Sequence, residues 1–347
     1  MKSKLKFIYL IVIVVWGGSL FANDDLLEKE YNKTFAVSKD AKLSVTNKFG
    51  SVQLNTWNKS EIKINVLIRI ENYSSKSKAE KLLNSIEIDM SGSRNNVTAT
   101  THIPKFKINN LKFSIDYHIN LPAEAELDIK QAFGNISCSD KIEGETKLVV
   151  KHGSMQFETL SNLENYLEVS FGDIIVEKVN NASVVMKHGD VSIEEADKLN
   201  LKTAYGDVEI EKVNVLSQKS SFGDVEINYV KDFDLNSNYS QVEIDELVER
   251  LEADLDFGDM EINKLHKDFS SIRIDSDNAG VEIDVEDGAG FSVDVLTKFG
   301  KFYTYDDDSI NREKISFNSY RYKGSVGKGN SGSKVIIEAN FANIEIK

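Results

Sequence analysis

Apolar and polar residues alternate along most of this chain, and an aromatic residue or a histidine followed by glycine interrupts the alternation at regular intervals. These doublets recur 17 to 19 residues apart, a period too regular for chance. Apolar residues at every second position on both sides of each doublet predict short strands rather than helices. The doublets are Phe133-Gly134, His152-Gly153, Phe171-Gly172, His188-Gly189, Tyr205-Gly206, Phe222-Gly223, Tyr239-Ser240, where serine replaces glycine, and Phe257-Gly258.

The positions within one unit indicate how the units fit together. Counted from the glycine, positions +2 and +4 are apolar, as Val208 and Ile210 are. We expect the aromatic residue at −1 to face the core and the glycine to make the turn, because glycine adopts positive φ without a steric penalty. One unit cannot bury its own apolar face, whereas stacked units can. The pattern therefore predicts an all-β fold, a parallel β-solenoid of 17–19-residue coils with like residues about 4.8 Å apart.

The same pattern divides the whole chain. A first coil is expected at 43–60, the repeats at 126–302 and a terminal coil at 335–347, after a polar leader and first strand entry at 23–42. Between them, 61–125 is expected to form antiparallel strands with a small helix that cap the first end, since an open coil exposes strand edges. The segment 303–334 contains an acidic turn at 306–308, a predicted strand at 315–322 and a glycine-rich loop, which together predict a hairpin.

The beginning of the chain predicts its compartment. Residues 1–22 run from lysines through an apolar stretch to small residues, the order of a secretory signal peptide, with cleavage expected after Ala22. An uncleaved anchor is the alternative, but the apolar run is shorter than the roughly 20 residues that a membrane span needs. We expect no membrane span in the mature chain, and a periplasmic, cell-surface or secreted location.

The overall charge excludes one class of partner. The formal net charge is −14, and removal of residues 1–22 takes away three lysines and no acidic residue, which gives −17. An acidic surface of this size repels nucleic acid, so no nucleic-acid partner is expected.

Acidic residues occupy the outward positions of the repeat and are the candidate site. Alternation places positions +1, +3 and +5 on one face, so the carboxylates are expected in rows about 4.8 Å apart. Solvent, neighbouring lysines or bound cations must offset their repulsion, and calcium prefers such oxygen ligands. These rows are a candidate weak calcium ladder, with a merely solvated acidic face as the alternative. Position +1 carries Asp173, Asp190, Asp207, Asp224 and Asp259; +3 carries Glu209, Glu226, Glu243 and Glu261; +5 carries Glu177, Glu194, Glu211 and Asp245.

Histidine and cysteine give no further candidate site. His152 and His188 share the −1 position, but Phe171 lies between them, and two rungs of roughly 10 Å separate them too far for one zinc ion. We expect both to stack in a ladder of aromatic rings. The single Cys138 stands at +4 and is expected to be a buried small hydrophobe.

No catalytic or cofactor-binding residue is assigned. A carbohydrate-active enzyme needs two carboxylates that flank the bond, and nothing distinguishes two among the many present. The repeat is unbroken from Asp173 to Leu265, which favours a non-enzymatic scaffold. The enzyme remains an alternative, with its site near Tyr239-Ser240 or at 277–280, where the repeat is irregular.

Several segments carry a resemblance to a known family. The unit NKFGSVQLNTW, the transition DYHINLPAEAELDIKQAFGNI and the units YGDVEI and FGDVEI resemble the bacterial putative-adhesin β-strand-repeat family of unknown function, which occurs in Bacteroidetes envelopes. The resemblance covers nearly the whole mature chain. It implies a non-enzymatic adhesin or envelope scaffold whose partner is an envelope protein, a cell-surface protein or a polysaccharide. Such proteins also occur beside extracytoplasmic sigma-factor systems, so a periplasmic partner of an anti-sigma protein is a further alternative.

Overall fold

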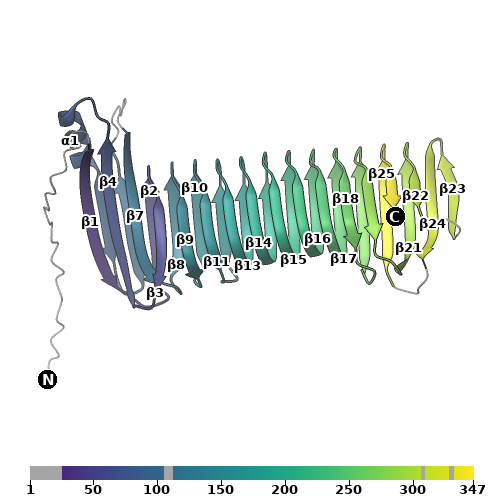
Figure 1. The fold of residues 1–347 in the computed structure, drawn as a ribbon, viewed down its shortest axis with the longest axis horizontal. Coiled ribbons are helices and arrows are strands. Elements are labelled where there is room, and N and C mark those ends of the chain that lie inside the picture. The colour runs from purple at the N-terminus through teal and green to yellow at the C-terminus, as the bar shows by residue number, and fades with distance from the viewer. Residues whose placement is uncertain (1–25, 105–111, 306–308, 328–331) are drawn as a thin grey trace, which may run out of the picture.

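The computed structural model describes residues 26–104, 112–305, 309–327 and 332–347. Its strands form one sheet of 26 strands, most of them paired in parallel, with one short helix. Figure 1 shows the strands side by side along the long axis of the molecule. The all-β, mostly parallel prediction is confirmed. The predicted signal peptide at 1–22 and the acidic turn at 306–308 lie outside the described residues.

Five long strands form the middle of the sheet, and each contains both halves of one unit. Ile210 lies beside Ile193 on one side and Ile227 on the other, each 17 residues away. Ile210 is fully buried, while the next residue toward the turn, Glu209, is exposed. The register predicted from the repeat is thus confirmed: like residues pair with like residues. The five strands are β13 (Ile174–Met186), β14 (Val191–Thr203), β15 (Val208–Ser221), β16 (Val225–Asn238) and β17 (Val242–Asp256).

Shorter strands continue the two halves of the unit on both sides of this block. Before it, one half continues through β8, β10 and β12 and the other through β9 and β11, all in parallel. After it, β17 pairs with both β18 and β19. The strands are β8 (Glu126–Ala132), β9 (Ile136–Ile142), β10 (Thr146–Lys151), β11 (Met155–Leu160), β12 (Asn165–Val169), β18 (Met260–Leu265), β19 (Ser271–Asp277), β20 (Val281–Val285), β21 (Gly290–Lys298) and β22 (Phe302–Thr304).

Antiparallel strands and the helix lie at the N-terminal end (Figure 1). There β4 pairs antiparallel with β1 and β7, and β5 with β6, while β2 and β3 pair in parallel with β8 and β9. The elements are β1 (Leu26–Ala36), β2 (Lys42–Lys48), β3 (Val52–Trp57), β4 (Glu61–Glu71), α1 (Lys76–Ser85), β5 (Glu87–Gly92), β6 (Asn96–His102) and β7 (Lys112–Pro122).

One expectation at this end is wrong. The segment expected as a polar leader forms β1, whose 11 residues pair with the whole of β4. Leu27, Tyr31 and Phe35 pack against the core from one side of this strand. The intervening charged residues obscure this apolar face in the sequence.

At the C-terminal end, the order of the strands in the sheet differs from their order in the sequence. β25 (Lys334–Asn340) lies between β19 and β21, and β26 (Ile344–Ile346) lies between β20 and β22, all in parallel. The last unit in the sequence is therefore inserted between two earlier units. Beyond β21, β24 (Ser319–Gly327) and then β23 (Ile310–Ser316) add antiparallel strands.

The strand predicted at 315–322 is also wrong. It contains the turn at Phe317-Asn318, where Asn318 adopts a left-handed φ of 54°. Alternation continues across this turn, so the pattern alone does not reveal it.

The core is a continuous set of mostly aliphatic side chains from alternate strand positions, extending along the whole sheet. Its largest fully buried members include Tyr117, Phe157, Phe233 and Phe269. Within the described ranges, no helix is long and apolar enough to cross a membrane.

Candidate functional site

Each unit reverses direction at its aromatic-glycine doublet, and the backbone explains both residues. Tyr205 and Phe222 adopt left-handed φ values of 59° and 58°. Gly206 follows Tyr205, and a Cβ at Gly206 would lie 1.9 Å from the carbonyl oxygen of Gly189 in the preceding unit. Gly206 is therefore required by the close approach of neighbouring turns.

The aromatic residues do not face the core as expected. Phe171, Tyr205 and Phe222 are 47 %, 55 % and 46 % exposed. Strand alternation would place −1 on the same side as the buried −3 position, where Ser220 is 4 % exposed. At Tyr205 and Phe222 the left-handed backbone breaks that alternation and turns the ring outward.

These outward rings form one continuous stack from Phe49 to Phe257. Neighbouring ring centroids are 4.7–5.1 Å apart, and the planes differ by 12° or less. His152 and His188 each lie between two aromatic rings, which confirms their expected place in the ladder. The rings cover one another's faces and present mainly their edges to solvent.

The aspartates at +1 accept hydrogen bonds from the backbone of the neighbouring turns. The carboxylate of Asp173 accepts the backbone N–H of Asp190 (3.2 Å), and Asp190 accepts that of Asp207 (3.0 Å). Asp207 in turn accepts the N–H of Asp224 (2.9 Å), and Asp259 that of Gly280 (2.8 Å). Each side chain therefore pairs a backbone donor in the next unit that strand pairing leaves free.

Uncharged residues do the same at the N-terminal units. Asn135 accepts the backbone N–H of Ser154 (2.9 Å), and the Ser154 hydroxyl accepts that of Asp173 (3.0 Å). Asparagine and serine at this position show that an acceptor is needed there and that a negative charge is not.

The glutamates at +3 form a longer row than the sequence predicted. Glu209, Glu226, Glu243 and Glu261 lie side by side on successive strands. The row continues through Glu282 on β20 and Glu345 on β26. We call these six residues the Glu row.

Partners are few along the Glu row. Asn263 donates a hydrogen bond to Glu243 (3.1 Å), and Lys347 forms ion pairs with Glu282 and Glu345. In the part of the chain that the structure describes, Glu209, Glu226 and Glu261 have no hydrogen bond or ion pair. The recurring Val/Ile-Glu-Ile triplet was the signal for Glu282 and Glu345, but the place of Glu345 beside Glu282 depends on the inserted last unit.

The carboxylates at positions +5 and +6 have more hydrogen-bond and ion-pair partners than those of the Glu row. Asn228 donates to Glu211 (2.7 Å), and Asn263 to Asp245 (2.9 Å). One position further, Lys178 pairs with Glu195 (2.7 Å), and this hydrogen bond lowers the pKa of the Glu195 carboxyl. Amide donors at +5 and opposite charges at +6 thus stand on neighbouring strands, where the Glu row has like charges.

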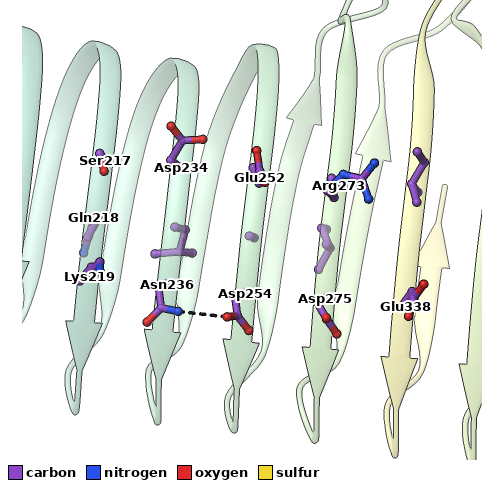
Figure 2. Close-up of a pocket in the computed structure, with 14 residues that line it drawn as sticks. Ser217, Gln218, Lys219, Asp234, Asn236, Glu252, Asp254, Arg273, Asp275 and Glu338 are labelled. Atoms are coloured by element: carbon purple, nitrogen blue, oxygen red, sulfur yellow. Dashed lines mark hydrogen bonds between the residues drawn. The ribbon is translucent and has the colours of Figure 1, made fainter.

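A shallow depression of about 690 Å³ crosses β15, β16, β17, β19 and β25 on the other half of the unit. Figure 2 shows its charged side chains in rows on neighbouring strands, with Asn236 hydrogen-bonded to Asp254 (3.1 Å). Arg250 pairs with Asp234 at 2.6 Å. This open polar surface offers hydrogen-bonding groups of both signs. Its charged lining residues are Lys219, Asp234, Glu252, Asp254, Arg273, Asp275 and Glu338.

Cys138 is the remaining candidate residue, and it is buried. It is 2 % exposed, as expected, and burial raises the pKa of its thiol to about 11. Among the described residues, no group of three or more His, Cys, Asp or Glu converges closely enough to hold a metal ion.

Comparison with known proteins gives matches among solved structures alone. No family model and no curated protein matches the chain. A putative cell adhesion protein from Clostridium sporogenes is 14 % identical, with 92 % of this chain and 99 % of that chain covered and a TM-score of 0.21. A putative adhesin from Bacteroides fragilis is 13 % identical over 92 % and 97 %, with a TM-score of 0.27. A putative lipid binding protein from Parabacteroides distasonis is 10 % identical over 94 % and 98 %, with a TM-score of 0.32. The first two descriptions name the same kind of protein as the family that the sequence resembles.

Proposed function

We propose that this chain is an exported, non-catalytic β-solenoid that presents the Glu row to a partner at the cell envelope, a surface protein or a polysaccharide. The observation that supports this proposal is the unbroken register of six glutamates on six neighbouring strands. The order of residues in 1–22 supports the export.

The Glu row is unfavourable for the isolated chain. Two unit charges about 4 Å apart repel by about 1 kcal/mol even in bulk water, and most members of the row have two such neighbours. The +6 position shows that the fold tolerates alternation, since Lys178, Glu195 and Lys212 follow one another there. A row that stays acidic over six strands fits a surface whose charge is offset by a partner or by cations that the partner shares.

A matched pair of variants tests the proposal. Four Glu→Gln substitutions, at Glu209, Glu226, Glu243 and Glu261, remove the same charge as four Asp→Asn substitutions at +1. The +1 asparagines can still accept the backbone N–H, as Asn135 does. The sites of the second variant are Asp173, Asp190, Asp207 and Asp224.

Binding of the protein from residue 23 onward would be measured to whole cells and to isolated envelope polysaccharide and envelope protein. We expect the wild type and the Asn variant to bind and the Gln variant to lose binding. Equal loss in both variants would mean that net charge alone acts, and no binding by the wild type to any probe would overturn the proposal.

Calcium is the cation proposed to share the row, bridging pairs of carboxylates on adjacent strands, because no three acidic groups of the described residues converge on one ion. The melting temperature of the wild type, compared in calcium and in chelator at one ionic strength, should be higher in calcium, and the Gln variant should lose the difference. Equal melting temperatures for the wild type would leave ionic screening as the only compensation.

A further inference from the structure

The aromatic stack is interrupted at one rung, and the backbone fixes where. The N–H of Phe257 donates to Asp277 O (3.0 Å), that of Asn278 to Asn340 O (2.9 Å), and that of Phe341 to Lys298 O (2.8 Å). Phe257, Asn278, Phe341 and Phe299 therefore lie on consecutive rungs. Asn278 occupies a position that carries an aromatic ring on the rungs before and after it.

The four residues share one backbone conformation, with φ values between 53° and 57°. Their Cα–Cβ bonds therefore point the same way, and the position of the missing ring is defined. Asparagine ends two bonds beyond Cβ, so it fills the inner part of that position and leaves the outer part to solvent.

Exposure shows which ring face is open. Phe133, Phe171 and Phe222 have a ring on each side and are 45–47 % exposed. Phe257 is 44 % exposed, so its face toward Asn278 is as well covered as theirs. Phe341 is 60 % exposed, although Phe299 covers its other face at 4.8 Å. The open face is that of Phe341.

The space above this face has the thickness of one ring. Phe257 and Phe341 are two rungs apart, about 9.6 Å at the usual strand spacing. Elsewhere in the stack the same interval holds one ring, since Tyr239 lies between Phe222 and Phe257 at 5.1 and 4.8 Å. A pyranose ring can lie on the open face of Phe341, and the polar groups of this rung, rather than its width, favour a sugar over an aromatic side chain.

The vacant rung carries two adjacent polar residues, Asp277 and Asn278. Asn278 and Asp277 are exposed, and the structure gives neither side chain a hydrogen bond or an ion pair among the described residues. Gly280 adds no side chain to this rung. A carboxamide supplies donors and an acceptor, and a carboxylate accepts from hydroxyl groups. The negative charge of Asp277 disfavours an acidic sugar.

We propose that the rung at Asn278 is a binding subsite for one neutral pyranose ring of a glycan. The apolar C–H face of the sugar packs on Phe341, and its hydroxyl groups bond to Asn278 and Asp277. The subsite lies outside the Glu row and does not depend on it. An aromatic side chain of a partner protein would leave both polar side chains unpaired.

The test uses the chain from residue 23 with ¹³C-labelled phenylalanine rings, titrated with maltohexaose, cellohexaose and mannohexaose. A Gly-Trp-Gly peptide and an oligogalacturonate serve as comparison probes. We expect at least one neutral oligosaccharide to shift the Phe341 ring signals, which the Phe341→Ala spectrum identifies. The two comparison probes should leave these signals unchanged.

Three variants locate the binding. Asn278→Phe places a ring in the vacant position and should weaken the binding at least about tenfold without lowering the melting temperature. Phe341→Ala removes the platform and should weaken it similarly. Phe222→Ala, in the continuous part of the stack, should bind like the wild type.

The outcomes that overturn the proposal are separate from those for the Glu row. Wild-type affinity in Asn278→Phe, a response to the peptide in place of the sugars, or no shift with any of the three neutral oligosaccharides would each refute it. The four-fold Glu→Gln variant should bind the oligosaccharide like the wild type, so failure of either proposal leaves the other standing.

Discussion

Two acidic rows lie two residues apart on the same face of this molecule, and the structure separates them. The aspartates at +1 accept backbone N–H groups from the next unit, and Asn135 and Ser154 replace them where the charge is absent. The side chains of the Glu row at +3 make few hydrogen bonds and ion pairs, and three of them make none among the described residues. The same carboxylate chemistry is structural in one row and available to a partner in the other.

The comparison shows why charge alone is a weak guide to function. In a stack of units, a residue beside a tight turn meets an unpaired N–H from the next turn, so any short acceptor is selected there. A residue in mid-strand meets the side chains at the same position of the neighbouring strands, and in the Glu row these carry the same charge. An acidic row in mid-strand therefore needs another explanation, while an acidic row at the turn does not.

The largest expected effect on stability distinguishes the buried side of the strands from the Glu row. Ile210→Asp places a charge at a fully buried position and should destabilise the fold by about 4 kcal/mol or more, whereas Glu209→Lys should change stability by about 0.5 kcal/mol or less. Urea unfolding measures both. Equal stability of the two variants would contradict the register on which both rows depend.

A smaller effect concerns the aromatic stack beside the Asp row. Phe222→Ala removes two ring contacts at 5.1 Å and should destabilise by about 1–3 kcal/mol in thermal or urea unfolding. Phe222→Tyr, the residue found on both neighbouring rungs, is the control and should be neutral. A neutral alanine variant would show that the stack contributes nothing to the turns.

The ion pair between β21 and β24 gives a pH-dependent contrast to the Glu row, most of whose members have no ion pair within the described ranges. Hydrogen bonds from Arg321 (both 2.7 Å) and then Lys323 lower the pKa of the Asp294 carboxyl. A lowered folded-state pKa contributes stability above the unfolded value near 4 and loses it as the pH falls through the folded value.

Acidification from neutral pH should therefore weaken β24 docking by about 1 kcal/mol, a value typical of a pair this exposed. Amide hydrogen exchange of β24 measures the change against pH. Asp294→Asn should abolish it, and Asp275→Asn, the same charge change on β19, should not. Persistence of the pH dependence in Asp294→Asn would exclude this pair as its source.

The smallest effect tests the repulsion within the Glu row. Glu226→Gln should stabilise the protein by a few tenths of a kcal/mol at low salt, and the gain should vanish at high salt. Glu195→Gln, which loses the Lys178 pair, should have the opposite sign. Destabilisation by Glu226→Gln would mean that this carboxylate already has a favourable partner.

The sequence predicted the inside of the strands well, because Val208 and Ile210 each recur at a fixed position and burial requires that they stack. The prediction was wrong where the alternation of apolar and polar residues does not determine the direction of the side chain. Tyr205 and Phe222 were expected inside, but a left-handed backbone turns them outward.

The order of the units in the sheet could not be predicted from the sequence either. Every unit has the same apolar pattern, so nothing local shows that Val335 pairs with both Ile272 and Val293. The place of Glu345 at the end of the Glu row, and the place of Phe341 beyond Asn278 in the aromatic stack, follow from that insertion. These parts of the candidate site could not be predicted, because they depend on the order of the units.

The most direct test of the difference between the two rows is the free energy of unfolding of three variants. Asp207→Ala leaves the N–H of Asp224 without its acceptor at 2.9 Å and should cost about 1 kcal/mol. Asp207→Asn keeps an acceptor and should restore most of that loss, while Glu209→Ala should lose nothing. Equal stability of Asp207→Ala and Glu209→Ala, or an asparagine variant as unstable as the alanine variant, would contradict a structural role for the Asp row.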